Sequence, residues 1–236
     1  MTTIGLLECD HVDERHRAVA GDTVDMFRAL LAPHVPDLDV VPYDVIGGEL
    51  PDDPDACDGW VCPGSRHSVY DELDWIAKLS RFVGDIRDAG MPFAGICFGH
   101  QMLAHALGGR VGRAASGWGV GTHTVTVDRQ EPWMDPPAVT LALHFMHQDQ
   151  VEALPPGAVV LGHARHCPVA VMRVGDSMVG VQAHPEFPAA YVDALLTDRV
   201  ARIGDDGVAA ARASLARPTD EITAGRWLAR VLSPPA

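Results

Sequence analysis

The stretch GICFGHQ at residues 95–101 constrains this chain more than any other. An apolar run at residues 91–96 predicts a buried strand, and the helix-forming residues 101–107 predict a helix that ends at two glycines. Cys97 is therefore expected on a sharp strand-to-helix turn, two residues from a glycine on each side. This is the spacing of a nucleophile elbow with cysteine in place of serine.

The predicted turn explains both glycines and favours a reactive thiol. A nucleophile at the tip of a sharp turn needs a strained backbone, and a side chain at Gly95 or Gly99 would crowd it. The helix that begins behind the turn offers unpaired N–H groups and a partial positive charge, which stabilise a thiolate. A buried structural cysteine is the alternative, because free cysteines are usually buried. Cys97 is thus a candidate nucleophile that needs a base.

A second apolar strand can supply that base. Residues 179–183 lead into His184, Pro185 and Glu186. A cysteine nucleophile needs a base, and the base needs an acid that orients it. His184 and Glu186 can take these two roles if their strand lies beside the strand of Cys97. A histidine alone at the end of a strand would indicate only a structural residue.

Composition limits the class of protein. The chain has 236 residues, of which 47% are hydrophobic, so we expect one domain over residues 1–236. The net charge of −14 argues against a nucleic acid or a membrane surface as partner, because both require a basic face. The sequence shows no secretory leader and no apolar run of about 18 residues. Together with five irregularly spaced cysteines, this predicts a reduced, cytoplasmic location.

No metal site is expected from the sequence. His163, His166 and Cys167 lie close together in the chain, but no second cluster of ligands completes a site.

Strands and helices alternate through the first half of the chain. Strands are predicted at residues 3–7, 38–43, 59–62 and 91–96, and helices at 23–31 (capped by Thr23), 75–89 and 101–107, with residues 8–22 as a loop. This alternation predicts an α/β fold with a mostly parallel central sheet flanked by helices. Ligands of such sheets bind beyond the carboxyl ends of the strands, where Gly64, Cys97 and His184 all fall.

The second half of the chain predicts a smaller antiparallel region. Short strands separated by proline or glycine are expected at residues 119–127, 139–145, 158–162, 169–174 and 178–182. Helices are expected at residues 189–200 and 206–216, and from a Thr219 cap to residue 232.

The two motifs together, G-x-C-x-G-x-Q at residues 95–101 and H-P-E at 184–186, resemble those of the class I glutamine amidotransferases. The resemblance runs from about residue 4 to residue 186 and is to the glutaminase domain of GMP synthetase as a stand-alone domain. It implies a catalytic triad of Cys97, His184 and Glu186. Such a triad hydrolyses the side-chain amide of glutamine through a γ-glutamyl thioester and needs no cofactor.

The resemblance also implies roles for residues around the triad. The backbone N–H groups of Gly64 and Phe98 are implied as the oxyanion hole, because a tetrahedral intermediate needs donors aimed at its developing negative charge. Gln101, His147 and Asp149 are implied to bind the substrate.

Structural alternatives stand beside these roles. Gly64 would also suit a plain Pro-Gly-Ser turn, Gln101 a helix surface, and Asp149 the exposed end of a hairpin. Gly119 departs from the family, since many relatives carry Glu there, and this puts in doubt any substrate contact at that loop.

Two further residues near the motifs have less defined roles. Arg66 is expected to be a solvated loop charge, with contact to a substrate carboxylate as the alternative. His100 has no predicted role beyond packing.

Three functions fit the sequence. The first is a glutaminase that delivers ammonia to a separate synthetase, docked near Cys97 and Gly64. The second is a self-sufficient γ-glutamyl peptide or conjugate hydrolase, and the third is a degenerate member that binds without turnover. The complete triad argues against the third, and the first is favoured because it is the commoner role in the family.

Overall fold

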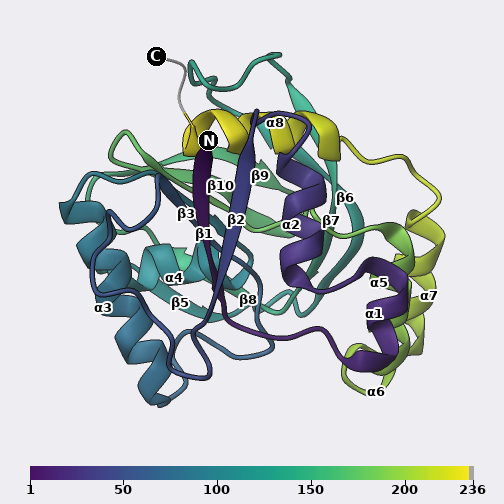
Figure 1. Ribbon diagram of the computed structural model, residues 1–236. Coiled ribbons are helices and arrows are strands. Elements are labelled where there is room, and N and C mark those ends of the chain that lie inside the picture. The colour runs from purple at the N-terminus through teal and green to yellow at the C-terminus, as the bar shows by residue number, and fades with distance from the viewer. Residues whose placement is uncertain (234–236) are drawn as a thin grey trace.

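The structure is a computed structural model that describes residues 1–233, and it is built around one nine-stranded sheet (Figure 1). The strands lie in the order β2-β1-β3-β4-β11-β10-β9-β6-β7. Five neighbouring strands run parallel: β2 (Leu38–Asp44), β1 (Thr2–Glu8), β3 (Gly59–Cys62), β4 (Phe93–Ile96) and β11 (Met178–Val181). The sheet then continues antiparallel through β10 (Cys167–Val174), β9 (Ala158–Ala164), β6 (Gly119–Val127) and β7 (Thr140–His147). This confirms the predicted α/β fold with an antiparallel region from the second half of the chain.

Helices cover both faces of the parallel strands. On one face α3 (Asp74–Asp88) and α4 (Phe98–Ala106) pack in a core with Leu7, Trp60 and Phe93. On the other face α2 (Thr23–Leu31) and α8 (Glu221–Leu232) pack over Ile4, Val61 and Ile96. Because both faces are buried, these strands are apolar throughout, which is why the sequence shows them as continuous runs.

The remaining helices gather at one end of the molecule. They are α1 (Glu14–Ala20), α5 (Ala189–Asp198), α6 (Val200–Ile203) and α7 (Asp205–Ser214) (Figure 1). Residues of α5 and α7 form a separate apolar cluster with Met146, at the end of β7. Within residues 1–233, every helix is too short or too polar to span a lipid bilayer.

The structure corrects several local predictions in the polar segments. Residues 8–22 were expected to form a loop but contain α1, which buries none of its residues and so leaves no hydrophobic period. The small sheet of β5 (Arg110–Arg113) and β8 (Asp149–Ala153) was not predicted, because β5 has one buried residue only.

The predicted helix caps were each one residue away from the observed ones. Asp22 caps α2 in place of Thr23 and forms a capping box with Asp25. Asp220 stands at the start of α8 in place of Thr219. Thr219 donates its hydroxyl to Glu221 Oε2 at 2.6 Å instead.

Strand β11 joins the two parts of the sheet. It was expected within an antiparallel region, and it does pair antiparallel with β10, but its other neighbour is β4, which it meets in parallel. Val181 is in register with Ile96. The segments that lead to His184 and to Cys97 therefore end side by side.

Candidate active site

Cys97 lies on a strained turn between β4 and α4. Its φ of 52° and ψ of −98° place a residue other than glycine in a left-handed conformation. The turn is fixed by hydrogen bonds: Cys97 N donates to Val181 O at 2.8 Å, and Gln101 N donates to Cys97 O at 3.0 Å. The backbone geometry predicted for a nucleophile elbow is therefore present.

The two flanking glycines allow close backbone approach. A Cβ at Gly95 would lie 2.8 Å from the backbone nitrogen of His100, and a Cβ at Gly99 would lie 2.9 Å from Cβ of Cys62. Both distances are shorter than van der Waals contact. The strained backbone conformation is that of Cys97, and the two glycines allow the neighbouring backbone to pack closely around this turn.

His184 follows β11 and forms a buried pair with Glu186. His184 Nδ1 lies 2.7 Å from Glu186 Oε1, and the two side chains are 3% and 1% exposed. Burial by itself lowers the pKa of His184, but the negative charges of Glu186 and of the Cys97 sulfur outweigh it and raise that pKa to about 10. The imidazole ring also stacks on Phe187, with 3.9 Å between ring centroids. His184 thus lies between a carboxylate and the Cys97 sulfur, and both favour the protonated form of its imidazole.

The predicted oxyanion-hole donors are available. A Cβ at Gly64 would lie 2.8 Å from His184 Cε1, so only glycine lets this turn approach the imidazole. Gly99 N donates to Pro63 O at 3.1 Å, which ties this turn to the turn of Cys97. Within residues 1–233, the backbone N–H groups of Gly64 and Phe98 donate to no protein acceptor. They remain free to bind an oxyanion.

Cys97 stands between two cavities. The first, here called the His184 cavity, has a volume of about 220 Å³ and is lined by Gly64, His184 and Glu186. The second, the Gln101 cavity, has a volume of about 60 Å³ and includes Gln101 in its lining. A larger groove of about 620 Å³ lies beside α2, but Cys97 does not line it.

The predicted substrate-binding residues meet in the Gln101 cavity. Its lining includes His147 and Asp149 as well as Gln101. Gln101 is buried, not on a helix surface, and its Nε2 donates to Asp149 O at 2.8 Å. His147 Nδ1 lies 3.0 Å from the same carbonyl oxygen, and Ser68 Oγ donates to Asp149 Oδ2 at 2.5 Å. These bonds hold the three side chains in the wall of the cavity. The role of these residues in substrate binding stays a prediction.

The structure explains why residue 119 is a glycine. A Cβ there would lie 2.6 Å from His147 Nε2, and it would also clash with His166. The two imidazoles lie 3.3 Å apart, Nε2 to Nε2. Burial and the neighbouring His166 lower the pKa of His147 to about 3, so this ring is neutral. His166 comes from the turn between β9 and β10, and no sequence motif indicated it.

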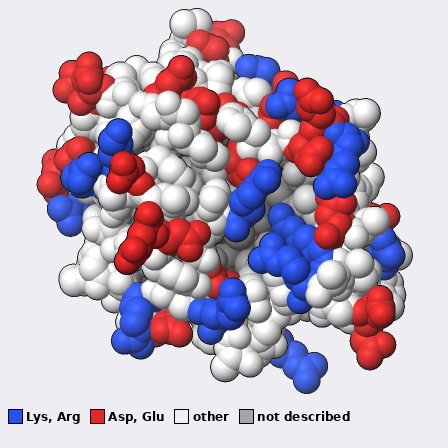
Figure 2. Space-filling model, turned by 90° about the horizontal axis from the view of Figure 1, so that it is seen from below, with Lys and Arg blue, Asp and Glu red and all other residues white. Residues whose placement is uncertain are grey.

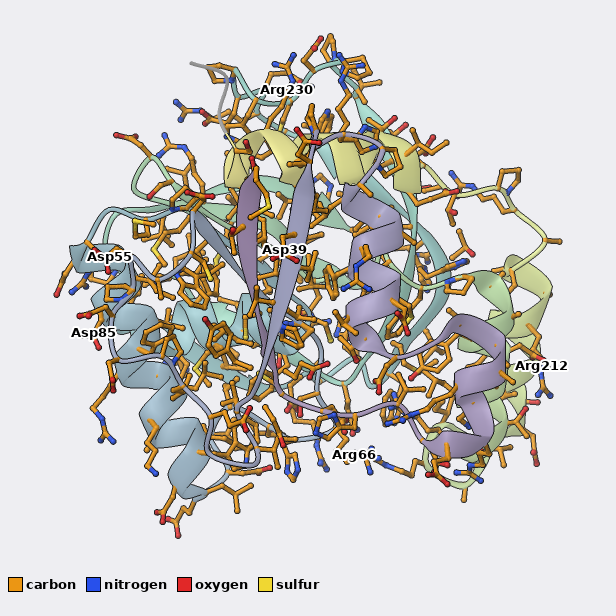
Figure 3. All side chains as sticks on the ribbon, in the orientation of Figure 1. Asp39, Asp55, Arg66, Asp85, Arg212 and Arg230 are labelled. Carbon is orange, nitrogen blue, oxygen red and sulfur yellow. The ribbon has the colours of Figure 1, made fainter. Side chains whose placement is uncertain are left out.

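The structure shows the contacts of Arg66 and His100, the two residues whose roles the sequence left less defined. Arg66 lies at the lower edge of the molecule (Figure 3), and its Nε donates to Asp10 Oδ1 at 2.8 Å. It is therefore an ion-paired loop residue and not simply a solvated charge. His100 is fully buried against Gly180, and burial lowers its pKa to about 4.

Two arginines of the site were missed by the sequence analysis. Arg199 and Arg202 line both cavities, from the junction of α5 and α6 and from α6. They belong to no motif, and a charge in a helix ordinarily indicates a solvated face.

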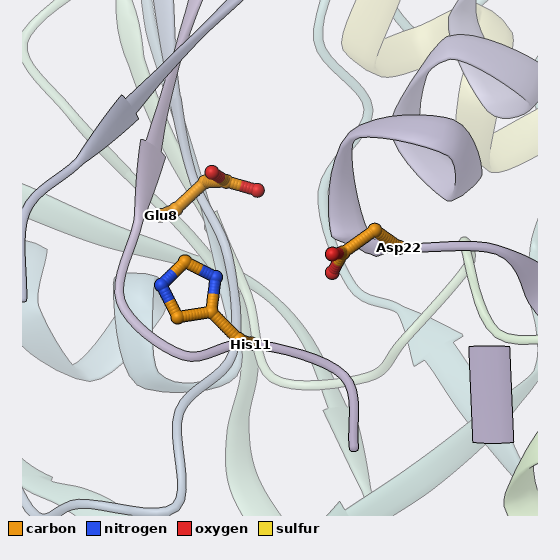
Figure 4. A group of neighbouring side chains, drawn as sticks. All are labelled: Glu8, His11 and Asp22. Carbon is orange, nitrogen blue, oxygen red and sulfur yellow. The ribbon is translucent and has the colours of Figure 1, made fainter. Parts of the chain in front are cut away.

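One group of side chains in the described residues has the spacing of a metal site (Figure 4). Ligand atoms of Glu8, His11 and Asp22 lie within 4.8 Å of one another. However, Asp22 Oδ1 accepts a bond from Thr23 N at 2.8 Å, and its Oδ2 pairs with Arg17 at 2.8 Å. Burial raises the pKa of Glu8, which favours a protonated carboxyl. A cation here would have to displace Arg17.

The histidines and cysteine noted in the sequence are dispersed. His163 pairs with Asp128 at 2.7 Å, His166 faces His147, and the thiol of Cys167 donates to Val169 O at 3.4 Å. They do not converge on one point.

Comparison with known proteins gives a consistent result. The family model for glutamine amidotransferase class-I matches residues 28–199. Gamma-glutamyl peptidase 3 of Arabidopsis thaliana is 34% identical over 154 residues, which are 61% of this chain and 61% of that protein. A glutamine-hydrolysing GMP synthase of Porphyromonas gingivalis is 28% identical over 195 residues, which are 72% of this chain and 37% of that protein. The matches thus span less than two thirds of these relatives' own length.

Solved structures agree on the fold. A glutamine amidotransferase from Thermotoga maritima superposes with a TM-score of 0.75 at 22% identity, covering 98% of this chain and 96% of that one. A putative GMP synthase subunit from Thermoplasma acidophilum superposes with a TM-score of 0.60 at 21% identity, covering 86% of this chain and 98% of that one.

Proposed function

This chain belongs to the class I glutamine amidotransferase family, and from that premise we propose that it hydrolyses γ-glutamyl amides with Cys97 as nucleophile, His184 as acid and base, and Glu186 as the orienting carboxylate. The observation that carries the proposal is the buried His184–Glu186 pair beside a cysteine with a φ of 52°. A buried charged pair is costly to fold, and it is kept where its charge has a use. The same observation argues against a degenerate member.

The proposed reaction has two steps. The Cys97 thiolate bonds to the amide carbon, and the negative oxygen is stabilised by the N–H groups of Gly64 and Phe98. His184 gives its proton to the nitrogen, the carbon–nitrogen bond breaks, and the amine leaves. Water then attacks the γ-glutamyl thioester while His184 takes its proton, the carbon–sulfur bond breaks, and glutamate is released. No cofactor is needed.

We prefer a self-sufficient γ-glutamyl peptide or conjugate hydrolase over the partner-dependent glutaminase that the sequence analysis favoured. The His184 cavity, on the side where the leaving amine must take its proton, has a volume of about 220 Å³. One water-sized molecule needs only about 10–15 Å³ of such volume, so the space exceeds what ammonia uses. The similarity to a gamma-glutamyl peptidase supports the same choice.

A glutaminase that feeds a separate synthetase is the second candidate. It is supported by the similarity to a GMP synthase and to a GMP synthase subunit. Tyr70 and Leu73, 44% and 37% exposed, lie in the segment that follows Gly64 and would belong to a docking face.

We also propose that residues 1–236 act as one domain in the cell. The sheet draws strands from both halves of the chain, which supports a single unit. All five cysteines are free, which supports the predicted reducing, cytoplasmic location.

Glutamate release by the purified chain tests these proposals. The substrates are glutamine and a panel of γ-glutamyl dipeptides, with Cys97→Ala as control. Fast hydrolysis of a dipeptide by the isolated chain is the expected result. Slow glutamine hydrolysis that rises at least tenfold with a recovered synthetase, and no dipeptide hydrolysis, would favour the second candidate. No turnover of any substrate would contradict both.

A further inference from the structure

We propose that the His184 cavity contains an anion subsite, formed by Arg199 and Arg202, that binds a carboxylate on the leaving amine. The preferred substrates are then γ-glutamyl amino acids or peptides with a free carboxylate, and not glutamine or γ-glutamyl derivatives of simple amines. This inference rests on the proposed function and names the substrate class of the same site.

The wall of the His184 cavity is rich in arginine although the chain is acidic. The net charge is −14, yet four arginines line this cavity: Arg15, Arg66, Arg199 and Arg202. Viewed from the end of the molecule that carries α6, basic side chains gather around a hollow (Figure 2). The same wall also carries four acidic residues, Asp10, Asp13, Glu186 and Asp198. Whether the cavity attracts an anion therefore depends on which of its charges are already paired within the protein.

Two of these arginines are neutralised within the protein. Arg66 Nη2 pairs with Asp10 at 2.8 Å. Arg15 Nη2 pairs with Asp198 at 3.0 Å. Arg15 also pairs with Asp13. The fourth acidic residue in the cavity lining, Glu186, pairs with His184, so all four lining carboxylates already have a cationic partner.

Arg199 and Arg202 are different, because neither forms an ion pair with a carboxylate of the described residues. Arg199 is half-buried at the junction of α5 and α6. Burial lowers its pKa, while the sulfur of Cys97 acts in the opposite sense. Arg202 lies over the ring of Trp118, 5.1 Å from its centroid, which leaves its donors without an anion. Arg199 is a partly buried cation without a carboxylate partner, which is unfavourable unless a ligand supplies the anion, whereas Arg202 is exposed.

The position of the catalytic groups indicates which part of the substrate this anion belongs to. His184 must protonate the leaving nitrogen, and it lines the His184 cavity but not the Gln101 cavity. Gln101 and Asp149, implied to bind the glutamyl group, line only the Gln101 cavity. The leaving amine therefore extends into the His184 cavity, whose wall includes Arg199 and Arg202, although both arginines also line the Gln101 cavity. Ammonia from glutamine would leave them unused, and a cationic amine would be repelled.

A matched pair of substrates isolates the carboxylate. γ-Glutamylglycine and γ-glutamylglycinamide differ only in that group. We expect kcat/KM to favour the carboxylate by about ten- to hundredfold, the effect of a hydrogen bond to a charged group. Arg199→Gln should bring this ratio close to one, Arg202→Gln should reduce it, and Arg199→Lys should keep part of it. Arg81→Gln, an exposed arginine on α3, is the matched control and should keep the full ratio.

Two further measurements keep the test independent of folding and turnover. Calorimetric binding of both compounds to Cys97→Ala should show the same preference without reaction. Thermal melting of Arg199→Gln should give a midpoint equal to that of the wild type or higher, because the variant removes an unpaired charge.

The outcomes separate this inference from the proposed function. Equal hydrolysis of both compounds by the wild type would overturn the subsite and leave the γ-glutamyl hydrolase standing. A ratio that survives in Arg199→Gln and Arg202→Gln alike would also overturn it, since the arginines would then bind the glutamyl carboxylate or nothing. No hydrolysis of any γ-glutamyl compound would overturn the proposed function, and the subsite with it.

Discussion

Replacing Glu186 by glutamine tests the proposed chemistry with little change in volume. Glu186 Oε1 lies 2.7 Å from His184 Nδ1, and side-chain exposures of 1% and 3% leave little room for water to replace the lost charge. Burial lowers the pKa of His184, and the carboxylate is the main influence that raises it to about 10. A glutamine whose NH₂ group faces Nδ1 would also stabilise the wrong tautomer, with the proton on Nε2.

We expect Glu186→Gln to lower kcat/KM by about 10⁴-fold, the loss found when the orienting acid of a serine-protease triad becomes an amide. The pH profile should change as well. In the wild type, activity should hold through neutral pH and fall as the pH rises through the His184 pKa of about 10, because a neutral imidazole cannot protonate the leaving nitrogen. In the variant, the fall should begin at a lower pH, since only the Cys97 sulfur still opposes burial.

The raised pKa of His184 should also make the stability of the folded chain depend on pH. The pKa of His184 in the folded chain lies above its ordinary value of 6.5, so the pair stabilises the folded chain fully below pH 6.5. That contribution is lost as the pH rises toward about 10. Thermal melts of Glu186→Gln should therefore show a weaker dependence on pH over this interval.

The assay is the rate of glutamate release from a γ-glutamyl dipeptide across neutral and alkaline pH. Glu49→Gln, at an exposed position, is the matched control and should behave as the wild type. An activity of Glu186→Gln within about tenfold of the wild type, with the same alkaline limb, would refute the role of this carboxylate.

Three further predictions follow from the same site. Cys97→Ala and His184→Ala should each abolish turnover, and the double variant should be no worse than either, because the two residues act as a unit; losses that multiply would show separate roles. A glutamine-analogue diazo ketone should alkylate Cys97, and mass mapping of the adduct to one of the other four cysteines would contradict the assignment. Gly64→Ala should lower kcat by about 10²–10³-fold, because the new Cβ, 2.8 Å from His184 Cε1, displaces both an oxyanion donor and the imidazole; unimpaired turnover would exclude this turn from the reaction.

The sequence by itself determined the central strands and the residues at their carboxyl ends. Strands buried on both faces are short apolar runs, and these are visible without any knowledge of the fold. The glycines around Cys97 and the motif at His184 likewise depend on local geometry, namely a sharp turn and the end of a strand. Cys97 and His184 were both expected at the carboxyl ends of strands, where ligands of such sheets bind. That these two strands lie parallel and side by side was decided only by the tertiary structure.

Only the tertiary structure decided the elements and charges that carry no local pattern. Helix α1 buries no residue, and the pairing of β5 with β8 joins segments far apart in the chain, so neither has a hydrophobic period to detect. His166 reaches Gly119 only because β9 and β10 bring it there. Whether an arginine is neutralised depends on which carboxylates lie within a few ångströms of it in space. Arg66 meets Asp10 and Arg199 meets none of the described acidic groups, a difference that arises from packing and has no counterpart in the order of the residues.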